Sequence, residues 1–299
     1  MWFKNLQLFR LPAFDDRALE TIEAALAHAA LHPCAPSDLR RLGWVPPLVG
    51  GAFVHAVNRQ WLIALGIEEK LLPSTVIRQM ANERAQTIET TEGRRVSRKE
   101  LRDLRESLAI ELLPRAFACR HTIFAWIDPL HGWLVVNTGS QPKAEELAEC
   151  LLKTTDGFSI ALPAPLRTPA SAMTAWMAAG EAPVGFTIDQ DIELRSPENA
   201  LVRYTRHSLE GKEIGHHIAE GKIVTRLGMT WNDRISFILD EKLRIKRLSF
   251  LDILKEENDG LADNEAERFD LDFTLMTGEL ARLFDDLLAA LGGEADAKH

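Results

Sequence analysis

Residues 74–113 contain the strongest local folding signal in the chain, two helical segments separated by a short turn. Ser74 is placed to cap the first helix, and Gly93 stands where that helix should end. Ser97 and Glu100 match a capping box, in which each side chain accepts a hydrogen bond from the other residue's amide. The second helix is apolar at helical spacing until Pro114, with Leu101, Leu104, Leu108 and Leu112. We therefore expect a protruding αα-hairpin carried by the rest of the chain.

The segments on both sides of the hairpin predict a mixture of strands and helices. Strand-like runs occupy residues 3–11, 52–57, 61–67, 121–127, 133–137, 184–188, 200–205, 222–229, 234–239 and 243–250. Helices are expected over residues 16–30, 142–152 and 278–291, the last with an apolar face that is more typical of a core than of an interface. Because strands and helices do not alternate regularly, we expect an α+β fold rather than a doubly wound sheet.

A proline-rich segment divides the chain. Three prolines fall within residues 163–169, where fixed φ angles and missing amide donors favour a linker. We expect an N-terminal α+β region over residues 1–160, with the hairpin inserted at 74–113. A C-terminal α+β region over residues 161–299 should end in the amphipathic helix.

Composition excludes several classes of protein. Apolar residues make up 46% of the chain and charged residues 26%, which is the balance of a folded protein and not of a disordered or fibrous one. The longest stretch without Asp, Glu, Lys or Arg, residues 42–58, contains two prolines and two glycines and is a poor membrane span. No signal peptide is evident, and three cysteines are too few for a disulfide framework. We expect a cytoplasmic protein without a membrane partner.

Catalytic motifs are missing from the sequence. It contains no phosphate-binding loop, no G-x-G-x-x-G and no G-x-S-x-G. His216 and His217 lie near Glu213 and Glu220, but the H-E-x-x-H order of a zinc site is absent. We expect no enzyme, metal or cofactor; the alternative is a hydrolase that uses Glu213, His216 and His217.

The net charge of −9 conceals a segregation of charge along the chain. Residues 248–299 contain 4 basic and 14 acidic side chains, so the other 247 residues contain 31 basic and 30 acidic ones. A positive surface is therefore compatible with an acidic protein.

The first basic zone lies on the hairpin. Its second helix places Arg95, Arg98, Arg102 and Arg105 on one stripe, flanked by Arg94 and Lys99. Such cations can contact successive phosphates of a nucleic acid. The same pattern also fits a solvated face held by pairs with Glu100, Asp103 and Glu106.

The second basic zone covers residues 195–247, with 11 basic and 7 acidic side chains. A strand in which Lys242, Arg244 and Lys246 alternate with aliphatic residues would display three cations on one face. By the same alternation Lys222 and Arg226 should share a face, and Arg203 and Arg206 flank Tyr204. Without a recognition helix, binding through these groups would contact the backbone and not read bases. An edge strand protected by cations against aggregation is an equal alternative.

Several strings in the sequence resemble the family of the recombination-associated protein RdgC. In the N-terminal half they are Trp2-Phe3-Lys4-Asn5-Leu6, Gly43-Trp44-Val45-Pro46-Pro47, Glu68-Glu69-Lys70, Leu72-Pro73, Leu112-Leu113-Pro114-Arg115-Ala116-Phe117 and Trp126-Ile127-Asp128. In the C-terminal half they are His217-Ile218, Gly221-Lys222, Val224-Thr225, Leu227, Trp231, Met276-Thr277-Gly278-Glu279-Leu280 and Leu291-Gly292-Gly293-Glu294. They occur in order along essentially the whole chain.

The resemblance implies a noncatalytic DNA-binding protein of the bacterial nucleoid. It implies a ring-shaped homodimer that encircles double- or single-stranded DNA with little sequence preference. It also implies restraint of the recombinase RecA, indirectly through the DNA that both proteins share. A protein-interaction module that acts on the recombinase directly is the alternative.

The resemblance implies DNA contact at Lys222 and Arg226, with Arg206 just upstream. Arg115 and Phe117 lie in a matching string and would belong to the ring's hole or to a ring contact. Together with the two basic zones, the candidate DNA-binding residues are Arg94, Arg95, Arg98, Lys99, Arg102, Arg115, Arg203, Arg206, Lys222, Arg226, Lys242, Arg244 and Lys246.

Overall fold

The computed structural model describes residues 1–11, 18–155, 159–209, 211–251 and 264–295. Its strands are β1 (Leu6–Arg10), β2 (Arg40–Val45), β3 (His55–Val57), β4 (Gln60–Leu71), β5 (Phe117–Asp128), β6 (Trp133–Asn137), β7 (Phe186–Arg195), β8 (Leu201–Tyr204), β9 (Ile223–Trp231), β10 (Ile235–Asp240) and β11 (Ile245–Phe250). Its helices are α1 (Ala18–His28), α2 (Ser74–Glu92), α3 (Arg98–Leu112), the 3-10 turn η1 (Leu113–Arg115), α4 (Gln141–Thr154), α5 (Pro169–Ala179), α6 (Lys212–Ala219) and α8 (Glu265–Ala290).

The strands form one antiparallel sheet in the order β2-β4-β5-β6-β1-β11-β10-β9-β7-β8, with β3 paired to β4. This mixture of a sheet with seven α-helices in the described ranges confirms the predicted α+β class. β1 lies at the seam between the two halves of the chain: it pairs with β6 over five residues and with β11 at Leu6 and Ile245. The two predicted regions therefore share a sheet, and their division at residue 160 stays a prediction.

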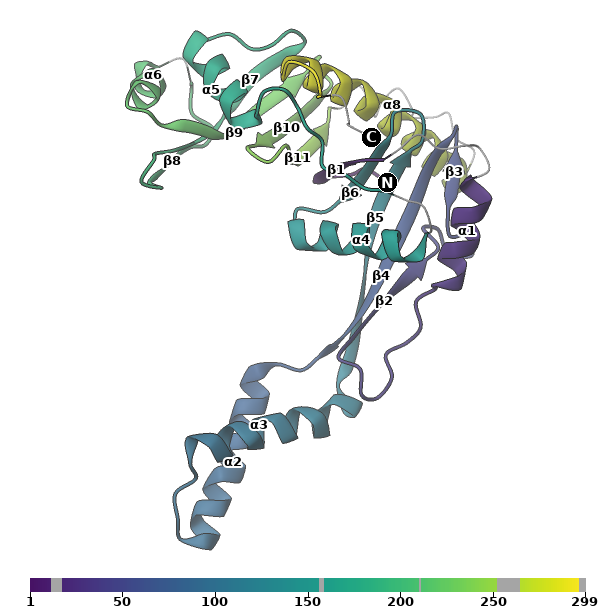
Figure 1. Cartoon of the computed structure of the whole chain (residues 1–299), viewed down its shortest axis with the longest axis vertical. Coiled ribbons are helices and arrows are strands. Elements are labelled where there is room, and N and C mark those ends of the chain that lie inside the picture. The colour runs from purple at the N-terminus through teal and green to yellow at the C-terminus, as the bar shows by residue number, and fades with distance from the viewer. Residues whose placement is uncertain (12–17, 156–158, 210, 252–263, 296–299) are drawn as a thin grey trace.

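Two hydrophobic cores lie on opposite faces of the sheet, and they involve different sets of strands. On one face, α5 and α8 pack against strands of both halves, around Trp126, Trp133 and Trp231. On the other face, α1 and α4 cover strands of the N-terminal half, β1, β2 and β4 to β6. Within the described ranges, β7 to β11 therefore have a helix-covered face and a face without a helix, which we call the open face. In Figure 1, α5 and α8 lie along the outer side of the curved chain, so the open face looks toward the inner side.

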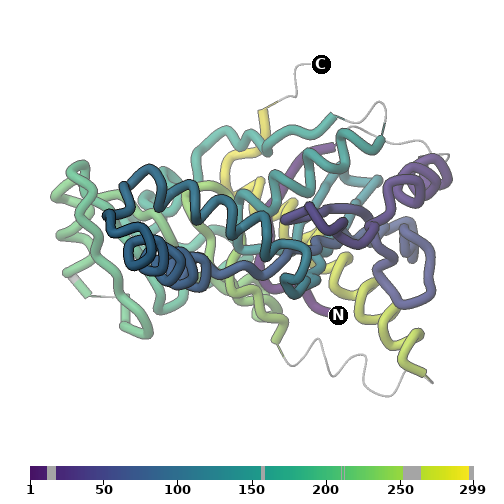
Figure 2. The backbone as a smooth tube through the Cα atoms, turned by 90° about the horizontal axis from the view of Figure 1, so that it is seen from below, coloured from purple at the N-terminus to yellow at the C-terminus, as the bar shows by residue number. Residues whose placement is uncertain are grey.

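The predicted hairpin is present as an arm. β4 and β5 stay in register from Trp61 and Ile127 to Leu71 and Phe117, and this ribbon carries α2 and α3 away from the body (Figure 1). Seen from below, the two arm helices lie side by side in front of the sheet (Figure 2).

Most local signals in the arm are confirmed. The capping box between Ser97 and Glu100 is formed, and Gly93 ends α2 in the left-handed conformation. The prediction that Ser74 caps α2 is wrong, because Pro73 takes the capping position and Ser74 is the first helical residue.

The final helix is longer than predicted. It starts at Glu265 and not at residue 278, and Asn264 caps it by accepting a hydrogen bond from the Glu267 amide. Gly278 resembles a boundary in the sequence, yet a Cβ at this position would meet no atom within 4 Å, and the glycine lies inside the helix. The apolar face of α8 lies in the core, as expected.

Candidate nucleic-acid interface

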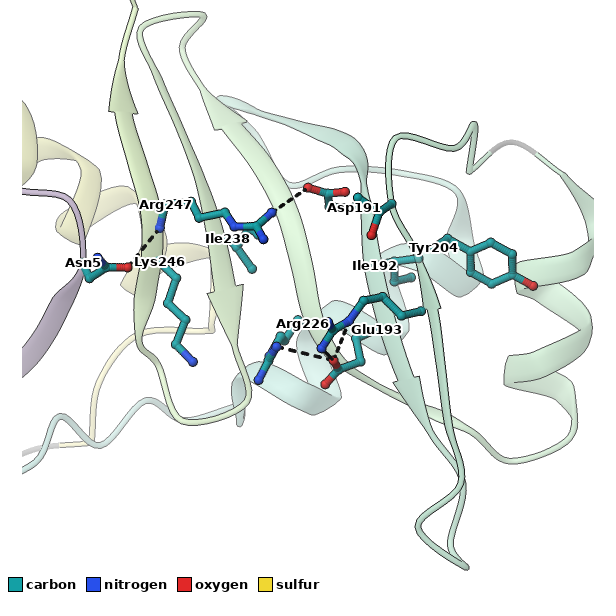
Figure 3. Close-up of a pocket in the computed structure, with 11 residues that line it drawn as sticks. Asn5, Asp191, Ile192, Glu193, Tyr204, Arg226, Ile238, Lys246 and Arg247 are labelled. Atoms are coloured by element: carbon teal, nitrogen blue, oxygen red, sulfur yellow. Dashed lines mark hydrogen bonds and ion pairs between the residues drawn. The ribbon is translucent and has the colours of Figure 1, made fainter. Parts of the chain in front are cut away.

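The open face contains a half-open cavity of about 210 Å3 between β7, β8, β9 and β11. Four cations line it: Arg203 from β8, Arg226 from β9, and Lys246 and Arg247 from β11. Its other polar lining residues include Asp191, Glu193 and Asn5 (Figure 3). We call this group of residues the cation cavity. Cations outnumber carboxylates there, so the cavity favours an anion.

Glu193 is the centre of the cation cavity. It is only 7% exposed, and its Oε2 accepts hydrogen bonds from Nε (3.0 Å) and Nη2 of Arg203. Nη1 of Arg226 lies 3.4 Å from the same oxygen, while Oε1 accepts a hydrogen bond from the Thr225 hydroxyl at 3.1 Å. Burial raises the pKa of Glu193, but the bonds from Arg203 and Thr225 and the charge of Arg226 outweigh it, so the pKa is lowered overall.

A bulge in β9 turns Arg226 into the cavity. Glu193 pairs with Arg226 while the next residue, Leu194, pairs with Val224, so Thr225 is an extra residue in β9. This breaks the alternation on which the shared face of Lys222 and Arg226 depends, and that prediction is wrong. The Lys222 amine instead contacts Glu220 Oε2 (2.6 Å) and His217 Nδ1 (3.0 Å) at the end of α6.

The predicted display of Lys242, Arg244 and Lys246 along one strand is confirmed in part and wrong for Lys242. Leu243 and Ile245 are buried in the core as expected, and Arg244 and Lys246 reach the same carboxylate. Lys242 lies in the turn before β11, where Leu243 has a φ of 59°. Arg244 Nε (2.5 Å) and Lys246 Nζ (3.1 Å) both contact Asp240 Oδ2, and Asp240 is 1% exposed. These two cations are therefore partly neutralised.

Arg247 is a cavity residue that the sequence pattern does not reveal. Ser236 pairs with Ser249, but Ile238 pairs with Lys246, so β11 contains one extra residue between them. Arg247 has a φ of 50° at this bulge, and its side chain is 73% exposed, with Nη1 3.7 Å from Asp191 Oδ2. Strict alternation would point it away from Lys246, and only the bulge brings the two together.

Arg206 follows β8 at the edge of this region. It is exposed with a φ of 52°, and its backbone amide donates to Asp191 Oδ1 at 3.1 Å. No ion pair joins its side chain to another described residue, so it is available to an anion.

The arm carries the least neutralised cations. Arg95, Arg98 and Lys99 are exposed near its tip and form no ion pair within the described ranges. Arg94 contacts Glu92 and Glu100, and Arg102 Nε is 3.8 Å from Glu106. The alternative of a fully paired solvated face thus describes only part of this helix.

The base of the arm combines a cation with exposed apolar side chains. Arg115 lies in η1 and is exposed. Phe117 begins β5 and is 84% exposed, and its register partner Leu71 is 55% exposed. Large apolar side chains that face solvent together are typical of a contact surface.

The histidines that resemble a metal site have other partners. His217 Nε2 lies 3.0 Å from the Tyr204 hydroxyl, and His216 Nε2 lies 3.1 Å from Glu220. Among the described residues, no three His, Cys, Asp or Glu side chains form a group that could hold a metal ion. No helix in the described ranges is long and apolar enough to cross a membrane.

Comparisons with known proteins agree with the resemblance in the sequence. The family model described as "Putative exonuclease, RdgC" matches residues 1–294. A "Recombination-associated protein RdgC" of Herminiimonas arsenicoxydans is 48% identical over 300 residues, covering 100% of both chains. The protein of the same name from Janthinobacterium sp. (strain Marseille) is 47% identical over 100% of both chains, and that of Dechloromonas aromatica is 46% identical over 98% of each.

Proposed function

Because the chain belongs to the RdgC family of recombination-associated proteins, we propose that it binds double- and single-stranded DNA through backbone phosphates, without reading the base sequence. The observation that carries the proposal is the arrangement of cations at both ends of one curved chain. The arm presents Arg95, Arg98 and Lys99, and the body presents the cation cavity among strands β7 to β11. Figure 1 shows the arm and these strands at opposite ends of the curved chain. Cations placed this way can contact phosphates along a duplex.

The binding should be independent of sequence. The cavity is built from strand side chains, and cations that contact backbone phosphates carry no information about the base sequence. Equilibrium titrations of two duplexes of unrelated sequence, and of a single strand of equal length, test this directly. Affinities within about twofold for the two duplexes support backbone contact; a preference of tenfold or more contradicts it.

A homodimeric ring is the assembly that we propose for this binding. The curved chain has an open inner side, and the exposed Phe117 and Leu71 at the base of the arm supply an apolar contact for a second copy. Closure by a second copy would enclose DNA and would keep the acidic outer helix α8 away from the phosphates.

In this account the protein acts in the cytoplasm, at the nucleoid, and restrains RecA-type recombination by occupying DNA that the recombinase needs. The alternative is a module that binds the recombinase directly, for which the acidic α8 on the outer side is the available surface. Strand-exchange assays separate the two. Variants that lose DNA binding should also lose inhibition in the occupancy account but keep it in the alternative.

Catalysis is not part of the proposal, although the family model carries an exonuclease description. Incubation of end-labelled duplex and single-stranded DNA with the protein and Mg2+ or Mn2+ tests this. Unchanged DNA supports a binding role, and shortening that rises with protein concentration contradicts it.

A further inference from the structure

The cation cavity differs from an ordinary basic patch because its cations are held in place by a buried carboxylate. Arg203 and Arg226 come from different strands, yet both contact the same oxygen of Glu193. Two guanidinium groups this close repel each other unless an anion lies between them. Glu193 supplies that anion from inside the protein.

Glu193 itself has little freedom to move. One carboxylate oxygen is engaged by the two arginines, and the other accepts the Thr225 hydroxyl hydrogen bond. Because both oxygens are engaged and the side chain is buried, Glu193 fixes where the arginines point.

The opposite wall of the cavity provides one fixed cation and one exposed cation. Lys246 Nζ lies 3.1 Å from the buried Asp240 carboxylate, which holds it in place. The neighbouring Arg247 has an exposed guanidinium 3.7 Å from Asp191, and its amide donates to Asn5 Oδ1 at 3.3 Å. Arg203 uses Nε and Nη2 on Glu193 and retains other N–H donors, as does Arg226. Figure 3 shows Arg226 beside Glu193, Lys246 on the neighbouring strand, and Arg247 directed toward Asp191.

We propose that the cation cavity is the binding site of one backbone phosphate of DNA, held between Arg226 and the pair Lys246 and Arg247, and that Glu193 is the positioning residue of this site. This inference rests on the proposed DNA-binding function and deepens it by assigning one phosphate to the cation cavity and naming the residue that positions its arginines. A DNA phosphate and free inorganic phosphate would present the same oxyanion to this site.

The variant Glu193→Gln tests the proposal by the direction in which DNA affinity changes. It removes a negative charge from the binding face, so long-range electrostatics alone would tighten DNA binding. Loss of positioning has the opposite effect, and we expect affinity for a random-sequence duplex to fall about tenfold, as for the loss of a charge-assisted hydrogen bond. Tighter or unchanged binding overturns the proposal.

Glu241→Gln is the matched control. Glu241 lies outside the cavity and pairs with Arg195, so this variant makes the same change in charge on the same half of the sheet. It should bind DNA as tightly as the wild type or more tightly. A loss equal to that of Glu193→Gln would show that the position of the carboxylate is irrelevant and would overturn the assignment.

Arg226→Gln tests the site even if Glu193→Gln folds poorly. It should lower the slope of log affinity against log salt by about one, because one phosphate contact is lost. Arg282→Gln, with the same charge change on α8, should leave the slope unchanged. Equal slopes for both variants overturn the phosphate site.

Arginine side-chain NMR distinguishes a DNA phosphate from a free anion. A 12-nucleotide single strand should shift the Nε–Hε resonance of Arg226 at a concentration where inorganic phosphate at equal ionic strength does not. A shift with inorganic phosphate alone overturns the assignment to DNA. If the wild type binds no DNA at low salt, the proposed function fails; if it binds and all the variants bind equally, only this inference fails.

Discussion

Phe117 pairs with Leu71 at the far end of the β4–β5 register, and both side chains face solvent where the arm leaves the body. In a single chain both side chains stay largely exposed, so a second copy is the partner that we propose. Phe117→Asp should shift the protein from dimer to monomer in size-exclusion chromatography with light scattering, because a charge cannot be buried in an apolar contact without cost.

Val184→Asp is the control for this substitution, since Val184 is also almost fully exposed but lies in the body before β7. It should leave the mass unchanged. A Phe117→Asp protein that keeps the dimer mass would contradict the ring contact at the base of the arm.

The arm cations should contribute to binding without affecting folding. Reversal of two of them, Arg95→Glu with Arg98→Glu, should weaken binding about equally for unrelated duplexes, because both contacts are to phosphates. Fluorescence anisotropy at fixed salt measures this. A second double variant, Lys153→Glu with Arg282→Glu, carries the same charge change on α4 and α8 and should bind more tightly than the arm variant. Equal losses would show that only net charge matters.

The lowered pKa of Glu193 predicts a pH dependence of stability. A carboxyl group whose folded-state pKa is lowered stabilises the protein above the ordinary glutamate range, and this contribution is lost as the pH falls through the folded-state pKa. Urea unfolding at several pH values should therefore show wild type more stable than Glu193→Gln at neutral pH, with the difference shrinking in acid. A difference that stays constant with pH would contradict the ionised, paired carboxylate.

Asp189, which also lies on β7, should show the opposite pH dependence of stability. Its pKa is raised by burial and by the charge of Asp191, although the Thr230 hydroxyl opposes this. Its ionisation therefore costs stability as the pH rises, and Asp189→Asn should lose less stability at neutral pH than in acid.

Gly43 on β2 packs closely against the backbone of Leu31. A Cβ at this position would lie 2.4 Å from the Leu31 Cα, so Gly43→Ala should destabilise the fold by about 1–3 kcal/mol in urea or thermal unfolding. Gly215→Ala is the comparison, because a Cβ there meets nothing within 4 Å inside α6 and alanine favours helix by about 1 kcal/mol. Equal stability of the two variants would contradict the close approach at Gly43.

The arm was predictable because its signals are local. A capping box and a helix-ending glycine depend on neighbours in sequence. The pairing of Leu6 with Ile245 has no such signal, since it joins strands more than two hundred residues apart.

The cation cavity was only partly predictable for the same reason. Arg203, Arg226 and Lys246 stand out as cations in strand-like runs, but the bulges at Thr225 and Arg247 decide which side chains meet. Glu193 was missed because a search for cations passes over the buried carboxylate that positions them.

The central claim is that this chain binds DNA through several phosphate contacts, and the salt dependence of its affinity for a random-sequence duplex tests it most directly. The account predicts a log–log slope of several units, because each contact releases close to one counterion, and the same slope for an unrelated sequence. A flat dependence on salt, or no binding at low salt, would contradict it.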